Sequence, residues 1–249
     1  MPATAARRVR FSSERMFYLG MTLVMLAGLV LGFSRSFFFK PWFPGAHGAP
    51  EPFFYVHGVV FAAWFVLLPV QLALVTAGRV SVHRTLGWFG AGLAGVMVVL
   101  GIVGGMIAAK RPTGFVDVPI PPLQFLIVPL ADAALFALFV ALAVAKRRDS
   151  QSHKRYMLLA TIAIVEAAVA RWPFAFMTGP SPVPHFAMSD LFTAMFLIPM
   201  VVWDVVSRRR VHPVTAWGGL VLVAALPLRL IVAETGAWLA FAGWLVGLL

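Results

Sequence analysis

Seven long apolar runs constrain this chain more than any other feature. A helix needs about 20 consecutive, mostly apolar residues to cross the hydrocarbon core of a bilayer. Runs of that kind cover residues 16–33, 53–77, 87–109, 122–145, 156–176, 186–206 and 214–232. Backbone polar groups in lipid must be satisfied within the segment, which leaves the helix as the way for such a run to span. The sequence therefore predicts an all-α integral membrane protein with seven transmembrane helices.

Composition excludes the soluble classes. The 249 residues are 61% hydrophobic and 12% charged, against a charged share of about 25% in soluble domains. The net charge of +11 would suggest nucleic acid in a soluble protein. Here the cations lie between apolar runs, so we assign them to membrane topology and to anionic lipid headgroups. The chain has no Cys, which excludes disulfides, iron–sulfur clusters and thiolate-ligated haem.

The placement of Lys and Arg predicts the orientation. Fourteen of the 20 lie in segments that share one side of the membrane with the basic N-terminal segment 1–15, and four lie on the other side. The positive-inside rule puts the N-terminus in the cytoplasm and, with seven spans, the C-terminus outside. The last stretch, 236–249, is short for a span. We expect an interfacial helix there, with a short eighth span as the alternative.

Three connections on the cytoplasmic side carry a His beside cations. They read His83-Arg84, His153-Lys154-Arg155 and Arg210-Val211-His212. The repetition suggests a four-helix unit over residues 53–175, with the other spans packed around it.

His83 and His153 open two helices that are separated by one intervening span. Alternate helices of a bundle can face each other, and a six-coordinate b-type haem takes one imidazole on each face of its iron. Its propionates need cations, and Arg84, Lys154 and Arg155 lie at both openings. The alternative is that these residues sit at helix ends and meet lipid phosphates.

Several ionisable residues lie inside predicted spans. Asp132 and Glu166 are near the middle of theirs, while Arg171 and Arg229 lie about one turn from the outer ends. Such groups cost about 2.5–3.5 kcal/mol on insertion scales, so they pair or line a cavity. We expect a polar pocket open to the outside and lined by His57, Asp132, Glu166 and Arg171. It would carry protons or bind a quinone or small polar substrate. A purely structural Arg–carboxylate pair is an equal alternative.

Two local predictions concern the sixth span. Asp204 and Arg208 are four residues apart at its inner end and are expected to form an ion pair. Pro199 is expected to kink the helix.

The elements His57-Gly58, Leu68-Pro69-Val70-Gln71, His83-Arg84-Thr85-Leu86-Gly87-Trp88 and His153-Lys154-Arg155-Tyr156-Met157 resemble a group of uncharacterised bacterial multi-pass membrane proteins. More distantly, the chain is similar to the transmembrane b-type di-haem cytochromes. That resemblance implies a bacterial inner-membrane protein with a four-helix core that holds haem between paired His residues. His83 and His153 match the inner pair, whereas the outer His57 has no partner on the fourth span.

The function expected from the sequence is therefore a membrane b-type haem-binding redox protein, with one haem near the cytoplasmic side. Two alternatives remain open. One is a small proton-coupled transporter that uses the carboxylates and no cofactor. The other is a non-catalytic accessory subunit of a membrane complex.

Overall fold

The computed structural model describes residues 13–43, 51–116, 118–174 and 185–249. Over these ranges the regular structure is entirely helical. Six helical stretches in them are long and apolar enough to cross a membrane: Ser13–Gly32, Pro52–Thr76, Val80–Lys110, Pro122–Ala145, Met188–Arg208 and Pro213–Ala233. These apolar helices indicate a multi-pass membrane protein. Residues 1–12 of the predicted basic segment 1–15 lie outside the described residues. The last two residues of the predicted span 156–176 also lie outside them.

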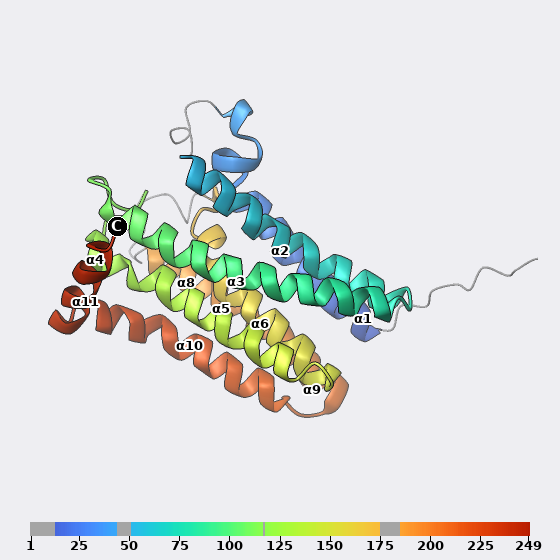
Figure 1. Cartoon of the computed structure of the whole chain (residues 1–249). Helices are drawn as coiled ribbons and strands as arrows, with labels where there is room; N and C mark the ends of the chain where they lie inside the picture. Colours follow the sequence, from blue (N-terminus) through green and yellow to red (C-terminus); the bar gives the residue numbers. More distant parts are fainter. Residues whose placement is uncertain (1–12, 44–50, 117, 175–184) are drawn as a thin grey trace, which may run out of the picture.

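The helices follow one another along the chain in Figure 1. They are α1 (Ser13–Gly32), α2 (Pro52–Thr76), α3 (Val80–Lys110), α4 (Pro122–Phe125), α5 (Ile127–Ala145), α6 (Ser150–Val169), α8 (His185–Met195), α9 (Leu197–Arg208), α10 (Pro213–Ala233) and α11 (Gly236–Val246). Short π and 3-10 turns at Ser34–Phe38 and Lys40–Trp42 follow α1.

Helix α6 differs from the expected fifth span. It begins at Ser150, six residues before the expected start, because the Asp149 side chain caps it by accepting the backbone N–H groups of Gln151 and Ser152. It is not among the six apolar stretches. Helices α1, α5, α8 and α10 all pack against it, so its polar residues meet protein. Seven spans therefore remain a prediction.

Prolines set two helix boundaries. Helix α8 ends at Met195 and α9 begins at Leu197, because Pro199 has no N–H to offer the carbonyl of Met195 four residues earlier. This break is the expected kink in the sixth span. Pro129 acts in the same way on α4, which ends at Phe125.

Five helices form a closed ring. Around it, α1 contacts α2, α2 contacts α3, α3 contacts α5, α5 contacts α6, and α6 contacts α1 again. Trp64 of α2 is 1% exposed inside the ring. Its indole Nε1 donates to Thr161 Oγ1 of α6 at 3.2 Å, and its ring lies edge-on to Phe136 of α5, with 4.9 Å between centroids. Helix α1, which was expected outside the unit of residues 53–175, thus closes the ring.

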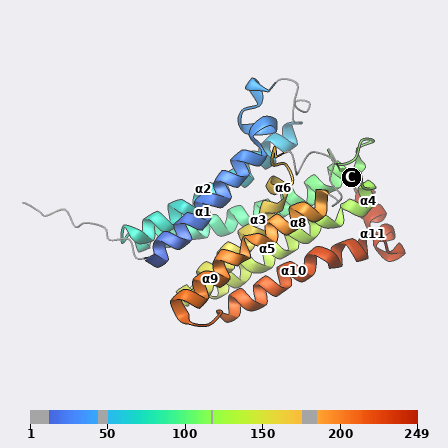
Figure 2. The same cartoon turned by 180° about the vertical axis from the view of Figure 1, so that it is seen from behind.

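A second group shares α5 and α6 with the ring. Helices α8 and α10 pack on α6, and α10 also packs on α5 and α8. Figure 2 shows α8, α9 and α10 on this side, with α1 and α2 across the molecule. The α5–α6 pair is therefore the common wall of two bundles.

The two ends of the molecule differ in character. We call the end with the α2–α3, α5–α6 and α9–α10 connections the basic end, because it carries Arg79, Arg84, Lys146, Arg147, Arg148, Lys154, Arg155, Arg208, Arg209 and Arg210. We call the other, where α3 connects to α4, the proline-rich end. There α11 packs on α4 and α3, and Trp238 Nε1 donates to the Leu123 carbonyl at 2.8 Å. With 11 residues, α11 is too short to span a bilayer.

Candidate functional site

Four helices each bring one charged side chain to a single point. Arg229 of α10 lies at its centre. Its Nη1 donates to Asp132 Oδ1 of α5 at 2.9 Å, and its Nη2 donates to Glu166 Oε2 of α6 at 3.1 Å. Nη2 also donates to Asp190 Oδ1 of α8. We call these four residues the Arg229 cluster.

The four charged residues share one level because of where their helices begin and end. Helices α5 and α8 start at the proline-rich end, and Asp132 and Asp190 lie about one and a half turns into them. Helices α6 and α10 finish at that end, and Glu166 and Arg229 lie about one turn before their last residues. The side chains therefore meet near the proline-rich end, short of its surface.

Burial makes the charge balance of the cluster important. Arg229 is 5% exposed, Glu166 6% and Asp190 7%. With every group ionised, three carboxylates around one guanidinium leave two net negative charges, and buried charge without a partner is costly.

Asp132 and Glu166 accept from different nitrogens of the same guanidinium, Asp132 from Nη1 and Glu166 from Nη2. Neighbouring carboxylates disfavour each other's charge. Ser189 Oγ donates to the other oxygen of Glu166, Oε1, at 3.2 Å.

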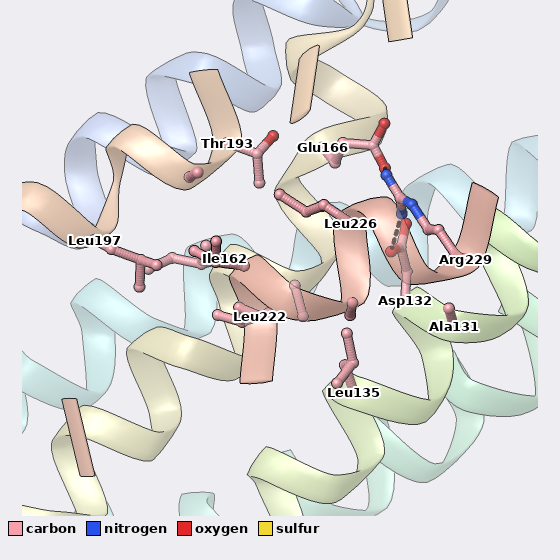
Figure 3. A pocket seen from close by; sticks show the side chains of 14 residues that line it. Ala131, Asp132, Leu135, Ile162, Glu166, Thr193, Leu197, Leu222, Leu226 and Arg229 are labelled. Atoms are coloured by element: carbon pink, nitrogen blue, oxygen red, sulfur yellow. Dashed lines mark hydrogen bonds and ion pairs between the residues drawn. The ribbon is translucent and has the colours of Figure 1, made fainter. Parts of the chain in front are cut away.

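A small cavity of about 20 Å³ adjoins the cluster. Its polar wall is formed by Asp132, Glu166, Arg229 and Thr193, and the remaining lining is apolar. In Figure 3 the side chains of Asp132 and Glu166 point at the guanidinium of Arg229, with Leu135, Leu222 and Ile162 on the apolar side.

The structure brings together two of the four residues expected in the outer pocket, Asp132 and Glu166. His57 lies elsewhere, between α2 and α3, with its Nδ1 3.3 Å from the Leu100 carbonyl oxygen and its ring stacked on Phe61 at 4.1 Å.

Arg171, the fourth expected pocket residue, lies just beyond the end of α6 and is exposed. Its Nη1 donates to the Ala167 carbonyl at 2.6 Å, and its guanidinium is 5.1 Å from the Phe33 ring centroid. Arg229 is the arginine that pairs with Asp132 and Glu166.

Sequence reasoning missed Asp190 and left Arg229 unassigned. Asp190 lies inside the predicted span 186–206, so the rule that singled out Asp132 applied equally to it. Arg229 was recognised as a cation in a span, but the sequence does not tell which helices face it.

His83 and His153 lie at the basic end, in the first turns of α3 and α6. His153 Nδ1 is 2.9 Å from the Ala143 carbonyl oxygen. That contact places a proton on Nδ1 and leaves the lone pair of a neutral ring on Nε2, as in His residues that ligate a metal.

His83 is held in the opposite tautomer. With its amide oriented to satisfy both neighbours, Gln71 accepts from the Gly87 N–H at 3.0 Å and donates to His83 Nδ1 at 2.7 Å. The ring proton of a neutral His83 then lies on Nε2, the nitrogen that an iron would need. His153 therefore fits an axial ligand as it stands, and His83 fits only if Gln71 turns.

Two of the three cations expected near haem propionates have carboxylate partners. Lys154 Nζ is 2.5 Å from Glu14 Oε1 of α1. Arg155 is 1% exposed and donates through Nε and Nη2 to Asp204 of α9. Arg84 is exposed at the basic end.

The expected pair between Asp204 and Arg208 is wrong. Asp204 pairs with Arg155, and its Oδ2 also accepts from Thr215 Oγ1 at 2.6 Å and from the His212 N–H at 3.1 Å. Arg208 Nη1 donates to Gln151 Oε1 at 3.4 Å. Asp204 therefore pairs with Arg155 of another helix, in the protein interior, and not with Arg208 of its own helix.

Within the described ranges, no group of three or more His, Asp or Glu side chains is arranged to hold a metal ion. Comparison with known protein families, curated proteins and solved structures found no match.

Proposed function

We propose that the chain spans a bacterial inner membrane seven times, with α6 as the span that the protein itself shields from lipid. The basic end would face the cytoplasm, since it gathers the cations of three connections. The proline-rich end and the Arg229 cluster would then lie toward the outside. The bacterial assignment rests on the resemblance noted in the sequence.

We further propose that the protein is a small proton-coupled carrier in which the Arg229 cluster binds the coupling proton. The observation that carries this proposal is the convergence of three buried carboxyl groups, those of Asp132, Glu166 and Asp190, on a single guanidinium. Acids gathered this closely do not all ionise readily, because each charge disfavours the others.

Proton binding would be coupled to helix packing. Addition of one proton to a carboxylate oxygen lowers the net charge of the fully ionised cluster from two negative charges to one. It also weakens one of the ion pairs that hold α10 against α5, α6 and α8. Release of that proton restores the carboxylate and the ion pair. The guanidinium thus converts a change in protonation into a change in how tightly α10 is held.

Infrared difference spectroscopy tests the proton site without knowledge of the transported substrate. The purified protein is titrated in lipid, and the carbonyl stretch of buried carboxylic acid is followed. We expect a titrating band that is lost or shifted in Asp132→Asn and Glu166→Gln. Glu234→Gln is the control, because Glu234 is exposed beyond the end of α10.

Flux provides the second readout. In proteoliposomes with a trapped pH-sensitive dye, an imposed membrane potential should drive proton uptake by the wild type and by Glu234→Gln. Uptake should be lost in Asp132→Asn and Glu166→Gln, and His83→Ala should retain it. Equal uptake in the wild type and in both carboxylate variants would overturn the carrier proposal.

A b-type haem at His83 and His153 is the second candidate, favoured by the position of both residues at the basic end and by the Nδ1 contact of His153. These two imidazoles would hold the haem, with Arg84 beside a propionate. A bound haem would supply one-electron transfer. Against it stands the hydrogen bond from Gln71 to His83.

The absorption spectrum of protein expressed with ample haem distinguishes the two candidates. A Soret band that His83→Ala and His153→Ala remove, and that His57→Ala keeps, would support haem. A wild-type spectrum without a Soret band would eliminate it.

A further inference from the structure

Two polar atoms beside the proton site have no hydrogen-bond partner. They are the hydroxyl Oγ1 of Thr193 and Nε of Arg229, and both are buried. Thr193, on α8, is 5% exposed and Arg229 is also 5% exposed. Buried polar atoms in native proteins nearly always have a partner, in the protein or in ordered water.

The cavity beside the cluster is lined by both of these residues. Its volume is about 20 Å³, and a cavity of about 10–15 Å³ is enough for a single water. A buried water also needs two to four polar partners. Thr193, Arg229, Asp132 and Glu166 all contribute to the lining, and Figure 3 shows all four among the side chains around the pocket.

The charges and the unpartnered atoms of the site select a neutral ligand. The three carboxylates would repel an anion, and a metal cation cannot accept a hydrogen bond from Arg229 Nε. Water can accept from the unpartnered Arg229 N–H and can either donate to or accept from the Thr193 hydroxyl.

We propose that one water molecule is bound in this cavity as part of the Arg229 cluster. It accepts a hydrogen bond from Arg229 Nε, shares one with Thr193 Oγ1, and hydrates the proton that the cluster would bind. The last role rests on the proposed function, whereas the water site itself rests on the cavity and the two unpartnered atoms.

The water is detectable through its own O–H stretch, which shifts in H₂¹⁸O while the carboxylic carbonyl stretch of the protein does not. In infrared difference spectra of the wild type across the titration, we expect an ¹⁸O-sensitive band. Thr193→Val removes the hydroxyl at nearly constant volume and should abolish the band. Thr193→Ser keeps the hydroxyl and should retain it.

A second variant keeps the test informative if Thr193→Val does not fold. Ala163 lines the cavity from α6 and is 4% exposed, so Ala163→Val fills the water's space. Ala160→Val is the control, because Ala160 is also buried on α6, at 0% exposed, but does not line the cavity. The ¹⁸O-sensitive band should be lost in the first variant and kept in the second.

The outcomes separate the water from the proton site. A titrating carboxylic band in the wild type without any ¹⁸O-sensitive band would overturn the water and leave the proton site standing. An ¹⁸O-sensitive band that survives both Thr193→Val and Ala163→Val would also overturn it. An ¹⁸O-sensitive band without a titrating carboxylic band would support the water and overturn the proton-coupled function.

Discussion

Arg229 and Arg155 are two buried guanidinium groups with different surroundings. Arg155 meets one carboxylate, Asp204, whose Oδ2 accepts two further hydrogen bonds. Arg229 meets three carboxylates. An ion pair whose charges cancel and whose polar atoms are hydrogen-bonded is suited to holding two helices together. A cluster with surplus acid is suited to exchanging a proton, since its charge balance improves when one is bound.

Removal of the Arg229 charge should destabilise the protein strongly. Arg229→Gln leaves the buried carboxylates without their cation, and breaking a buried pair typically costs about 3–5 kcal/mol. The loss is measurable as a lower melting temperature in detergent. Arg147→Gln, at an exposed position, should change it little.

Neutralising the acids as well should recover much of this loss. Adding Asp132→Asn and Glu166→Gln to Arg229→Gln leaves hydrogen-bonding groups and fewer unpaired charges. A triple variant that melts no higher than Arg229→Gln would contradict an electrostatic origin for the effect.

His212 should make stability depend on pH. It precedes α10, and its Nδ1 accepts the Val214 N–H at 3.1 Å, which requires an unprotonated Nδ1. Burial, followed by the charges of Arg155 and Arg208, lowers the pKa of His212 below its ordinary value of 6.5. The unfolded chain therefore takes up a proton first as the pH falls, and the folded state loses stability from about pH 6.5 downward.

The melting temperature should accordingly fall on acidification through this range. His212→Asn preserves a side-chain acceptor suited to a helix N-cap but does not titrate, so its melting temperature should fall less. Parallel curves for the two proteins would assign the pH dependence to other groups.

At the scale of the element, lipid-exposed and protein-enclosed helices differ in how much of them the sequence predicts. The apolar runs at 53–77, 122–145 and 214–232 agree with α2, α4–α5 and α10 to within a residue. For these helices the bilayer imposes both length and composition. Helix α6 was misplaced by six residues at its start, because its polar first turns are stabilised by an Asp149 cap and by partners on α1 and α9.

Only part of the candidate site could be predicted from the sequence, because the sequence shows which residues lie in the membrane but not which helices face each other. Depth in the membrane identifies Asp132 and Glu166 as costly residues that need partners. It does not tell that Arg229, Asp190 and Thr193 face them, because neighbours across helices depend on how the bundle closes. His83 likewise was chosen from its position at a helix start, but the Gln71 contact that sets its tautomer depends on α2–α3 packing.

Glycine allows α1 to approach α6 closely. A Cβ built on Gly32 would lie 2.1 Å from the backbone oxygen of Ala168, whereas one on Gly20, in the same helix, would meet nothing within 4 Å. Gly32→Ala should therefore separate α1 from α6 and lower the melting temperature. Gly20→Ala should leave it unchanged or raise it, since Ala favours a helix by about 1 kcal/mol. Similar melting temperatures for both variants would contradict this close approach.

At the scale of the whole molecule, the α5–α6 pair lies between two bundles that carry different candidate sites. The five-helix ring carries the His83–His153 pair at the basic end, and the second bundle carries the Arg229 cluster near the proline-rich end. The two candidate functions thus belong to opposite ends and to different bundles. A variant of one candidate site is therefore a suitable control for a variant of the other site.

Reporter fusions test the seven-span topology. Green fluorescent protein joined after Arg210, in the α9–α10 connection, should fluoresce, because that connection is expected in the cytoplasm. Alkaline phosphatase joined after Leu249 should be active, because seven spans put this end outside. Active phosphatase after Arg210 would reverse the orientation. Fluorescence after Arg210 together with inactive phosphatase after Leu249 would place both positions on the cytoplasmic side, which would contradict seven spans.

The order of synthesis gives the Arg229 cluster one more consequence. A ribosome delivers Asp132, Glu166 and Asp190 to the bilayer before Arg229 emerges. Until α10 inserts, these three acids lie in an incomplete bundle that lacks Arg229. The buried acids therefore gain their cation only when α10 inserts, and a chain truncated before α10 should be degraded faster than the full chain.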